Sequence, residues 1–282
     1  MRACVVGADG QLGRALVAAL PGAVALNRAG LDIADAEAVA GHDFTGVDVV
    51  FNAAAYTAVD RAETESAAAW RANALGPAHL AAAAARHGFT LVHVSTEYVF
   101  DGTATGPMPE ETPLAPLGVY GASKAAGELA VRAAPRHVIA RTSWVVGDGG
   151  NFVATMARLA RDGVRPSVVD DQVGRPTFTR DLAAALIALA EREAGVYHVT
   201  NDGDPVSWYG LATEVFTRCG RSPGDVTPAS TAEYGALQSR AGTPPPAHRP
   251  ANSVLDLSRL TRAGVTMPPW RDGLGAHLGT VR

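Results

Sequence analysis

Tyr120 and Lys124 are the residues whose types and spacing most clearly suggest acid–base chemistry. Their Y-x-x-x-K spacing places both side chains on one face if a single helix carries them. A free tyrosine has a pKa of about 10, and a nearby ammonium group lowers that pKa because it favours the phenolate. The phenol can then donate a proton to a carbonyl oxygen as a hydride reaches the carbon. The pair therefore predicts a ketone reductase, although the spacing alone also occurs by chance.

Ser95 and Thr96 strengthen this interpretation. They follow a predicted strand, Thr90–Val94, at the carboxyl end where doubly wound sheets bind their ligands. A hydroxyl at that end can orient and polarise the same carbonyl group. The alternative is a turn pair without chemistry, because serine and threonine are also common in turns.

A glycine pattern near the start of the chain indicates a nucleotide site. Gly7, Gly10 and Gly13 form G-x-x-G-x-x-G between a predicted strand, Ala3–Val6, and a predicted helix, Leu12–Leu20. Glycines permit a tight turn and close approach of the backbone to a pyrophosphate, and the helix N-terminus supplies free N–H groups. The position at a strand-to-helix junction favours a dinucleotide site over a turn without a ligand.

The segment after the second strand bears on the cofactor. An acidic residue about 20 positions after the glycines would bind the ribose 2′-hydroxyl of NAD. The chain reads Ala25-Leu26-Asn27-Arg28 there and has no acid. Arg28 can face a 2′-phosphate, which favours NADPH and leaves NADH open. The alternative for Arg28 is an ordinary solvated surface charge.

These residues need an α/β scaffold to bring them together, and the first half of the chain predicts one. Short apolar runs alternate with alanine-rich helical stretches, which indicates βαβ units and a parallel sheet covered on both faces. The further predicted strands are Val47–Asn52 and His137–Arg141, and the further predicted helices are Ala67–Arg86 and Ser123–Ala134. We predict a Rossmann-type doubly wound parallel sheet.

The second half predicts a smaller lobe with some segments returning to the core. Ser207 is a predicted N-cap of a helix that runs to Cys219 with Gly220 after it, and Ala229–Pro250 is a predicted loop. We predict a nucleotide-binding core over residues 1–145 and a mainly substrate-binding lobe over residues 146–282. The other predicted elements are the strands Val168–Val173 and Gly195–Thr200 and the helix Asp181–Arg192.

Composition excludes several classes of protein. The chain has 282 residues, 47% of them hydrophobic, and a net charge of −4, which suits a globular core and argues against a nucleic-acid partner. Cys4 and Cys219 have no metal-ligand spacing. No signal peptide and no apolar stretch of roughly 20 residues is visible, so we expect a cytoplasmic protein with no membrane partner.

The order of glycine loop, Ser95-Thr96 and Y-x-x-x-K resembles the extended short-chain dehydrogenase/reductase superfamily. Five further segments are similar to the dTDP-4-dehydrorhamnose reductase family within it. They are Asn52-Ala-Ala-Ala-Tyr-Thr-Ala-Val-Asp60, Ser95-Thr-Glu-Tyr-Val-Phe-Asp-Gly102, Arg141-Thr-Ser-Trp-Val145, Val169-Asp-Asp-Gln-Val-Gly-Arg-Pro-Thr177 and Arg249-Pro-Ala-Asn-Ser253. The resemblance extends from Met1 to about Leu278.

This resemblance implies a substrate and a set of site residues. The substrate would be a dTDP-linked 4-keto-6-deoxysugar, dTDP-4-dehydro-L-rhamnose, reduced at C4 with Tyr120 as the acid supported by Lys124 and Thr96. The implied cofactor contacts, together with Tyr120 and Lys124, are Gly7, Gly10, Gln11, Leu12, Gly13, Arg28, Asp32, Ile33, Ala53, Ala54, Ala55 and Tyr56. The implied substrate contacts are Thr57, Ser95, Thr96, Glu97, Trp144, Gln172, Arg175 and Thr177.

Three positions depart from the family pattern. Glu97 stands where the family often has Asp, and Arg175 stands where a small residue is usual, so Arg175 can meet the diphosphate or serve as a loop charge. Ala15 stands where members with a metal-bridged dimer carry a glutamate, so we expect no structural magnesium. We expect a monomer or a weak homodimer.

Two other functions stay open. One is a reductase for a related nucleotide-linked 4-keto-deoxysugar of secondary metabolism, because both reactions need the same hydride chemistry and pocket shape alone separates them. The other is a non-catalytic subunit that binds cofactor without turnover, since a fold does not fix a function. The intact set of Thr96, Tyr120 and Lys124 argues against the second.

Overall fold

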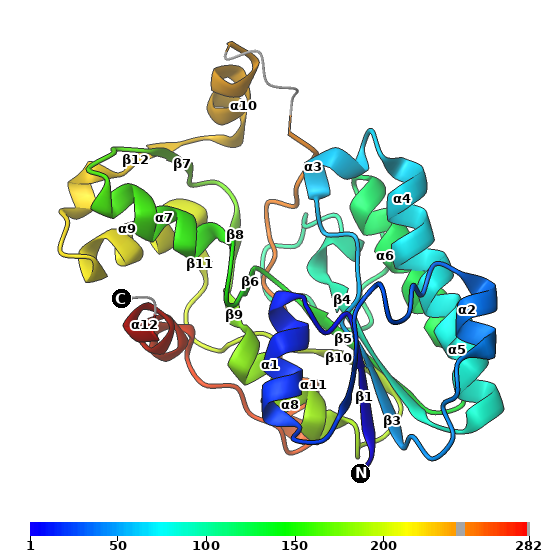
Figure 1. Cartoon of the computed structure of the whole chain (residues 1–282). Helices are drawn as coiled ribbons and strands as arrows, with labels where there is room; N and C mark the ends of the chain where they lie inside the picture. Colours follow the sequence, from blue (N-terminus) through cyan, green and yellow to red (C-terminus); the bar gives the residue numbers. More distant parts are fainter. Residues whose placement is uncertain (241–245, 281–282) are drawn as a thin grey trace.

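The chain folds around a six-stranded parallel sheet, which confirms the predicted α/β class (Figure 1). The structure is a computed structural model and describes residues 1–240 and 246–280. The strand order is β10-β5-β4-β3-β1-β2. The strands are β1 (Ala3–Val6), β2 (Val24–Leu26), β3 (Val49–Asn52), β4 (Thr90–Thr96), β5 (His137–Thr142) and β10 (Gly195–His198).

Helices cover both faces of this sheet, as the apolar strands predicted. Helices α1 (Gln11–Ala19) and α8 (Thr179–Leu189) pack on one face, and α5 (Gly76–His87) and α6 (Val119–Val131) pack on the other (Figure 1). The residues of β1 and β3 are all buried between these layers. The remaining elements of this half are α2 (Ala36–Gly41), α3 (Val59–Ala62), α4 (Ser66–Trp70), the π-helix η1 (Arg71–Leu75) and the 3-10 helix η2 (Glu97–Val99).

A separate hydrophobic core lies in the second half of the chain, built around Trp144, Phe216 and Trp270. Helices α7 (Phe152–Arg161), α9 (Trp208–Arg218) and α12 (Trp270–Thr280) surround it. The division of the chain near residue 145 stays a prediction. The other elements are β6 (Val145–Val146), β7 (Ser167–Val169), β8 (Val173–Gly174), β9 (Thr177–Phe178), β11 (Val206–Ser207), β12 (Thr227–Ala229), η3 (Pro223–Asp225), α10 (Thr231–Arg240) and α11 (Ser258–Arg262).

The predicted ends of α9 are confirmed. The Ser207 hydroxyl accepts a hydrogen bond from the Gly210 N–H at 3.0 Å, which satisfies one of the free donors at the helix start. Gly220 follows the helix with a φ of +77°, a left-handed conformation that glycine adopts without strain. Among the residues described, no helix is both long and apolar enough to cross a membrane.

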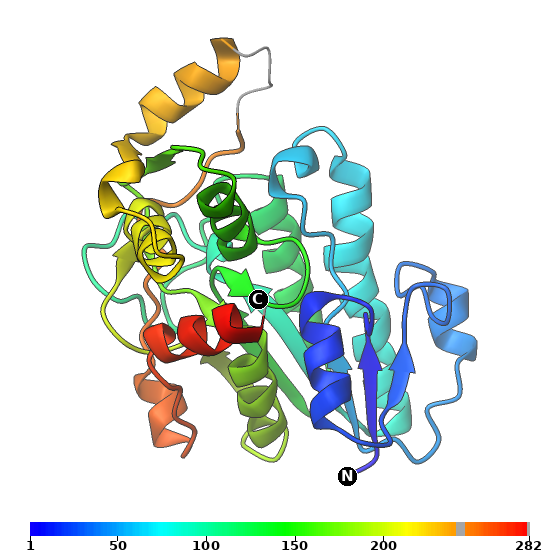
Figure 2. The ribbon, with the colours of Figure 1, turned by 60° about the vertical axis from the view of Figure 1, so that its left-hand side comes forward.

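The predicted loop over Ala229–Pro250 is wrong for the part that forms α10, which stands out from the lobe (Figure 2). Ser230 and Glu233 form a capping box, because each side chain accepts a hydrogen bond from the backbone N–H of the other. This capping box was present in the sequence as S-x-x-E. Residues 241–245, which contain part of the proline run, lie outside the described residues.

The predicted strand Val168–Val173 is also wrong as one element. The structure divides it into β7 and β8, which pair with different strands. Two aspartates cause the break, because their side chains bind backbone and hydroxyl groups of other segments. Asp170 accepts from the Ser207 hydroxyl, and Asp171 accepts from the backbone and hydroxyl of Thr231.

Candidate active site

The N-terminal half of α6 carries both Tyr120 and Lys124, because the helix begins before the predicted start at Ser123. The helix begins at Val119, after the extended residue Gly118. No side chain of Gly118 can cap it, and the Glu63 carboxylate instead accepts a hydrogen bond from the Val119 N–H at 2.9 Å. A negative charge at this end also suits the helix dipole. The start of the helix is therefore held in place by a residue from α3's C-terminal end.

Lys124 is buried, with 2% of its surface exposed. Its Nζ donates a hydrogen bond to the Val94 carbonyl oxygen at 2.6 Å, which ties α6 to β4. Burial lowers the pKa of Lys124 to about 8, because the charged ammonium loses its hydration. The negative charge of Glu128 on the same helix raises the pKa of Lys124 and so opposes the effect of burial.

The surroundings of Tyr120 raise the pKa of its phenol, so the expectation that Lys124 lowers it is wrong for this arrangement. Burial is the main cause, and the negative charge of Glu97 and the neighbouring Tyr98 add to it. A hydrogen bond with the Thr96 side chain lowers the pKa of Tyr120 and so opposes the effect of burial. Lys124 is not among the groups that shift the pKa of Tyr120, and its ammonium group donates to the Val94 carbonyl instead.

The hydroxyl pair lies within the last two residues of β4, which is two residues longer than predicted. Thr96 donates from Oγ1 to Glu97 Oε2 at 2.7 Å and accepts from the Tyr98 N–H at 3.2 Å. Ser95 is buried, and its hydroxyl has no hydrogen-bond partner among the residues that the structure describes. Thr96, rather than Ser95, therefore connects this strand end to Tyr120.

Glu97 begins the 3-10 helix that follows β4 and is almost fully buried. Burial raises the pKa of its carboxyl group to about 7. Hydrogen bonds from the side chains of Thr96 and Ser253 oppose this rise. Burial therefore brings the protonation change of this carboxyl group towards neutral pH, beside the Thr96 hydroxyl that hydrogen-bonds to Tyr120.

The glycine loop forms one end of a groove of about 520 Å³. Gly7 has a φ of +80°, and a Cβ on it would lie 2.5 Å from the backbone nitrogen of Ala54. A Cβ on Gly13 would lie 2.1 Å from the Gly7 carbonyl oxygen. The backbone is thus packed closely at both positions, and α1 begins after Gly10 with no side chain capping its free N–H groups.

Most of the predicted cofactor contacts line this groove. They are Gly7, Gly10, Arg28, Asp32, Ile33, Ala53, Ala54, Ala55 and Tyr56. Gln11, Leu12, Gly13, Tyr120 and Lys124 do not line it. Gln11 accepts a hydrogen bond from the Gly147 N–H at 2.9 Å, and Leu12 packs into the core.

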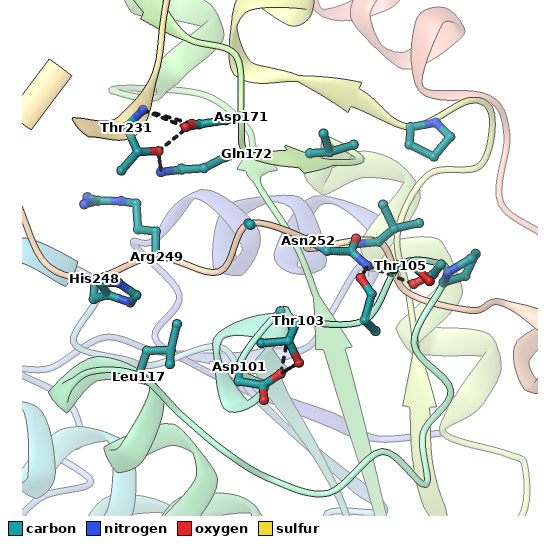
Figure 3. Close-up of a pocket in the computed structure, with 18 residues that line it drawn as sticks. Asp101, Thr103, Thr105, Leu117, Asp171, Gln172, Thr231, His248, Arg249 and Asn252 are labelled. Carbon is teal, nitrogen blue, oxygen red and sulfur yellow. Dashed lines mark hydrogen bonds between the residues drawn. The ribbon is translucent and has the colours of Figure 1, made fainter. Parts of the chain in front are cut away.

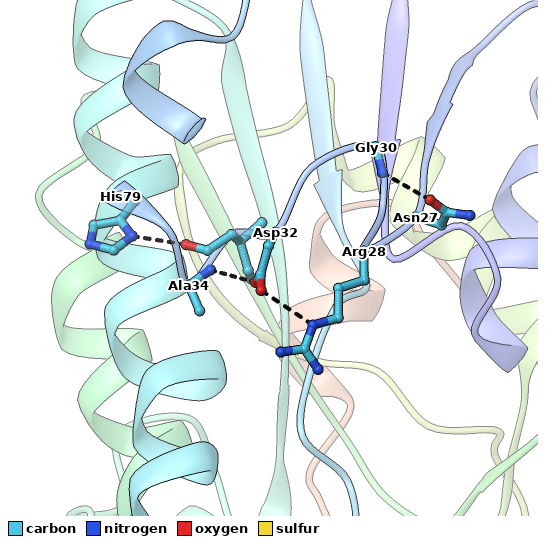
Figure 4. Close-up of polar contacts among 7 residues, drawn as sticks. Asn27, Arg28, Gly30, Asp32, Ala34 and His79 are labelled. Atoms are coloured by element: carbon cyan, nitrogen blue, oxygen red, sulfur yellow. Dashed lines mark hydrogen bonds and ion pairs between the residues drawn. The ribbon is translucent and has the colours of Figure 1, made fainter. Parts of the chain in front are cut away.

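A turn after β2 closes the far end of the groove (Figure 4). Arg28 Nε contacts Asp32 Oδ2 at 3.2 Å, while 86% of the arginine side chain stays exposed. Asn27 Oδ1 accepts from the Gly30 N–H, and Asp32 Oδ1 accepts from the Ala34 N–H. These bonds fix the turn, so Arg28 presents its terminal nitrogens from a defined backbone.

A second cavity, of about 750 Å³, lies between the loop that follows β4 and the segments around Gln172 and Arg249 (Figure 3). Among the predicted substrate contacts, Gln172 lines it, and its Nε2 donates to the Thr231 hydroxyl at 2.9 Å. The sequence reasoning missed its other polar residues as site residues. They are Asp101, Thr103, Thr105, Asp171, Thr231, His248, Arg249 and Asn252.

Tyr120 lines a small cavity that lies next to this larger one. Tyr98 and Tyr120 line the small cavity, and the two cavities share Leu117 and His248 as lining residues. The two tyrosine rings meet edge to face with their centroids 5.7 Å apart. Tyr120 therefore lies beside the larger cavity and within hydrogen-bonding reach of Thr96.

The remaining predicted substrate contacts have other positions. Trp144 has a φ of +47°, which is unusual for a bulky residue, and stacks on Trp208 with centroids 3.6 Å apart. Arg175 donates to the carbonyls of Gly203 and Leu255, so it holds loops together. Thr177 is fully buried, and Thr57 is exposed. Within residues 1–240 and 246–280, no cluster of three or more His, Cys, Asp or Glu residues could hold a metal ion.

Comparisons with known proteins identify the family to which the chain belongs. The family model "RmlD substrate binding domain" matches residues 1–282. A curated relative, dTDP-4-dehydrorhamnose reductase of Mycobacterium tuberculosis, is 45% identical over 296 residues, covering 98% of this chain and 92% of the relative.

Two solved structures are similar over nearly their whole length. The dTDP-4-dehydrorhamnose reductase of Bacillus anthracis, in complex with NADP, has a TM-score of 0.90 and 35% identity and covers 99% of both chains. The Clostridium acetobutylicum enzyme of the same name has a TM-score of 0.90 and 37% identity, covering 100% of this chain and 99% of its own. The chain therefore belongs to the dTDP-4-dehydrorhamnose reductase family of oxidoreductases.

Proposed function

We propose that this chain reduces the C4 ketone of dTDP-4-dehydro-L-rhamnose to dTDP-L-rhamnose with NADPH as the hydride donor. The observation that carries the proposal is the position of Tyr120, which hydrogen-bonds to Thr96 and lines a small cavity that shares Leu117 and His248 with the larger one. Membership of the reductase family and the NADP held by the Bacillus anthracis relative support it.

The groove beside β1 and β2 has the features that a dinucleotide needs. Gly7 and Gly13 leave no room for a Cβ, and the uncapped N–H groups of α1 face the loop, as a pyrophosphate requires. Arg28 would meet a 2′-phosphate at the far end, and Ala53 to Tyr56 would lie along the cofactor. When bound there, the cofactor would supply a hydride to the substrate carbonyl.

The protonation state of Tyr120 suits a proton donor. Its raised pKa keeps the phenol protonated at neutral pH, so the proton is in place when the substrate oxygen becomes negative. The Thr96 hydroxyl would orient that oxygen. Lys124 would hold the cofactor ribose, and its bond to Val94 fixes the helix that carries Tyr120.

The larger cavity has the size for a nucleotide sugar and polar residues that could contact one. Its volume of about 750 Å³ lies within the usual range for small-molecule sites. Arg249, whose Nη2 contacts Asp60 at 2.8 Å, and His248 supply positive or polarisable groups for a diphosphate. Gln172, Asp171 and Asn252 would contact the sugar and the base.

The first test is the reaction itself. Purified protein with enzymatically generated dTDP-4-dehydro-L-rhamnose should oxidise NADPH and yield dTDP-L-rhamnose, identified by NMR of the C4 configuration. A panel of related nucleotide-linked 4-keto-deoxysugars serves as the comparison. A higher kcat/KM for another sugar would contradict the proposed substrate, and no NADPH oxidation with any of them would contradict the reductase activity.

Tyr120→Phe tests the proposed acid. We expect kcat to fall at least about 100-fold, the usual contribution of a positioned acid, while the Kd for NADPH stays close to that of the wild type. Tyr197→Phe is the matched control, because the Tyr197 hydroxyl binds the Glu193 carbonyl far from the site. Wild-type kcat in Tyr120→Phe would remove Tyr120 as the acid.

Arg28→Ala tests the proposed 2′-phosphate contact. We expect kcat/KM for NADPH to fall roughly 10-fold or more, as for loss of a charged hydrogen bond, and kcat/KM for NADH to stay unchanged. Arg161→Ala, at an exposed position of α7, is the control. A wild-type protein that strongly prefers NADH would refute the contact.

A further inference from the structure

Glu97 is a buried carboxyl group without a cation to balance it. Only 2% of its surface is exposed, and it forms no ion pair in the described part of the chain. A buried charge without a partner is costly, and hydrogen bonds from neutral groups offset only part of that cost. Glu97 lies at the end of β4, beside the proposed acid. Its cost in this position indicates a function that depends on an ionisable carboxyl group.

Glu97 is linked to Tyr120 through one hydroxyl group. Thr96 Oγ1 donates to Glu97 Oε2 at 2.7 Å, and the Thr96 side chain also forms a hydrogen bond with Tyr120. A threonine hydroxyl can accept one proton and donate another at the same time. The three side chains therefore form a continuous path for a proton from the carboxyl group to the phenol.

We propose that Glu97 resupplies the proton that Tyr120 loses in each turnover, and that this proton passes through the hydroxyl of Thr96. The proposal rests on the proposed function, because it requires Tyr120 to act as an acid. It adds a role for Glu97 beyond the expected contact with substrate.

The transfer balances in protons. Tyr120 gives its O–H proton to the oxygen of the reduced carbonyl and becomes a phenolate. When Glu97 is protonated, its O–H donates to Thr96 Oγ1, which reverses the bond that the carboxylate accepts, and the Thr96 hydroxyl turns towards Tyr120. The Thr96 O–H proton then moves to the phenolate oxygen, and the Glu97 O–H proton moves to Thr96 Oγ1. Glu97 is left as a carboxylate, and it regains one proton from water after the product leaves.

The groups around Glu97 allow it to hold a proton at neutral pH. Burial raises its pKa to about 7, so about half of the molecules carry the proton there. The titratable groups that face it are Tyr98 and Tyr120, while Ser253 contributes a neutral hydroxyl. Two further charged groups act on the pKa of Tyr98, which Arg249 lowers and Asp60 raises. No neighbouring cation holds Glu97 permanently ionised.

The first arm of the test needs no substrate. The phenol of Tyr120 is titrated by its ultraviolet absorbance in wild type and in Glu97→Gln, and the signal lost in Tyr120→Phe identifies it. The Glu97 carboxylate raises the pKa of Tyr120, so Glu97→Gln should lower that pKa. An unchanged phenol titration would overturn the proposal, whatever the substrate proves to be.

The second arm separates proton supply from simple positioning. In Glu97→Gln the first turnover, measured by rapid mixing of enzyme and NADPH with limiting substrate, should lose less than the steady-state rate does, because Tyr120 already holds its proton. The steady-state kcat should fall 10-fold or more. The wild-type kcat should also fall as pH rises through about 7, and this dependence should disappear in the variant.

Two further variants complete the test. Glu97→Asp keeps a carboxyl group and should restore a pH-dependent steady-state rate. Glu110→Gln removes another buried carboxyl group, one that accepts from the His198 N–H outside the site, and should leave the pH profile unchanged.

Two results of the second arm would overturn the proposal. One is an equal loss in the first turnover and in the steady state, which would show that Glu97 only positions Thr96. The other is a wild-type steady-state rate in Glu97→Gln. A wild-type protein that turns over no keto-sugar would instead contradict the proposed function, and the phenol titration would still decide whether Glu97 and Tyr120 are coupled.

Discussion

Two buried glutamates flank the candidate site and differ in their partners. Glu128 lies on α6, the helix of Tyr120, and its two oxygens accept from Arg141 Nε at 2.9 Å and Nη2 at 2.7 Å. Glu97 lies at the end of β4 and accepts from hydroxyl groups of Thr96 and Ser253. Both side chains are almost fully shielded from water.

The difference separates a structural charge from a reactive one. The two-point contact with Arg141 fixes α6 against β5, and Arg141 also donates to the Glu110 carbonyl oxygen. Such a pair holds its charges ionised and its helix in place. Hydroxyl partners fix position but supply no positive charge, so Glu97 remains free to gain or lose a proton near neutral pH.

The largest expected effect comes from breaking the structural pair. Glu128→Ala leaves the Arg141 guanidinium buried without its partner and should lower the free energy of unfolding by about 3–5 kcal/mol. Urea unfolding followed by circular dichroism measures it. The double variant Glu128→Leu with Arg141→Met should recover most of the loss, because both buried charges are then gone. A single-variant loss below about 1 kcal/mol would mean that the pair does not hold the helix.

Glu97→Gln should raise the free energy of unfolding instead of lowering it. The folded-state pKa of Glu97, about 7, lies above the ordinary value of 4.5, so its stability contribution is present at low pH and is lost as pH rises through about 7. At pH 8 the variant should therefore be more stable than wild type, by up to about 3 kcal/mol, and this gain should shrink towards pH 5. Thermal unfolding at both pH values measures it, and a variant less stable than wild type at pH 8 would refute the difference between the two glutamates.

Lys124 extends the comparison to a buried cation. Its folded-state pKa, about 8, lies below the ordinary value of 10.5, so between these values the unfolded chain binds a proton that the folded chain does not. Stability should therefore gain up to about 3 kcal/mol from this group as pH rises from 8 to 10.5. The gain should be absent in Lys124→Met. Equal pH dependence of urea unfolding in both proteins would contradict this.

The smallest expected effect concerns Ser253. Its hydroxyl is the weakest of the groups that lower the pKa of Glu97, so Ser253→Ala should raise that pKa slightly further. The measurement is the midpoint of the pH dependence of kcat, which should move upward with little change in its maximum. A midpoint that moves downward would show that Ser253 does not stabilise the carboxylate.

Much of the scaffold could be predicted because its signals are local. The apolar runs of β1, β4 and β5 and the cap at Ser207 are short patterns that burial and helix geometry enforce. The sharing of one helix by Tyr120 and Lys124 follows from a spacing of four residues. The glycine loop is equally local, since two of its positions leave no room for a side chain.

The site features that the sequence did not predict depend on which segments, distant in the sequence, come together in the folded chain. The bond from Lys124 to Val94 spans 30 residues, and the spacing of Tyr120 and Lys124 gave no sign of it. Arg249 and Asn252 reach the larger cavity from a segment near the end of the chain. Their motif was visible in the sequence, but no spacing showed which cavity they enter. The low exposure of Glu97, which sets its pKa, likewise exists only in the folded chain.

The stack of Trp144 on Trp208 gives the protein an optical property of its own. The indole rings lie 3.6 Å apart with an angle of 14° between their planes, and Phe152 packs against Trp208. Two identical chromophores at this separation share their excited states, so the pair should produce a split circular dichroism signal that a lone tryptophan lacks. Because Trp144 follows β5 and Trp208 begins α9, the amplitude of that signal would report, without any label, whether the sheet and the lobe keep their relative position during a reaction cycle.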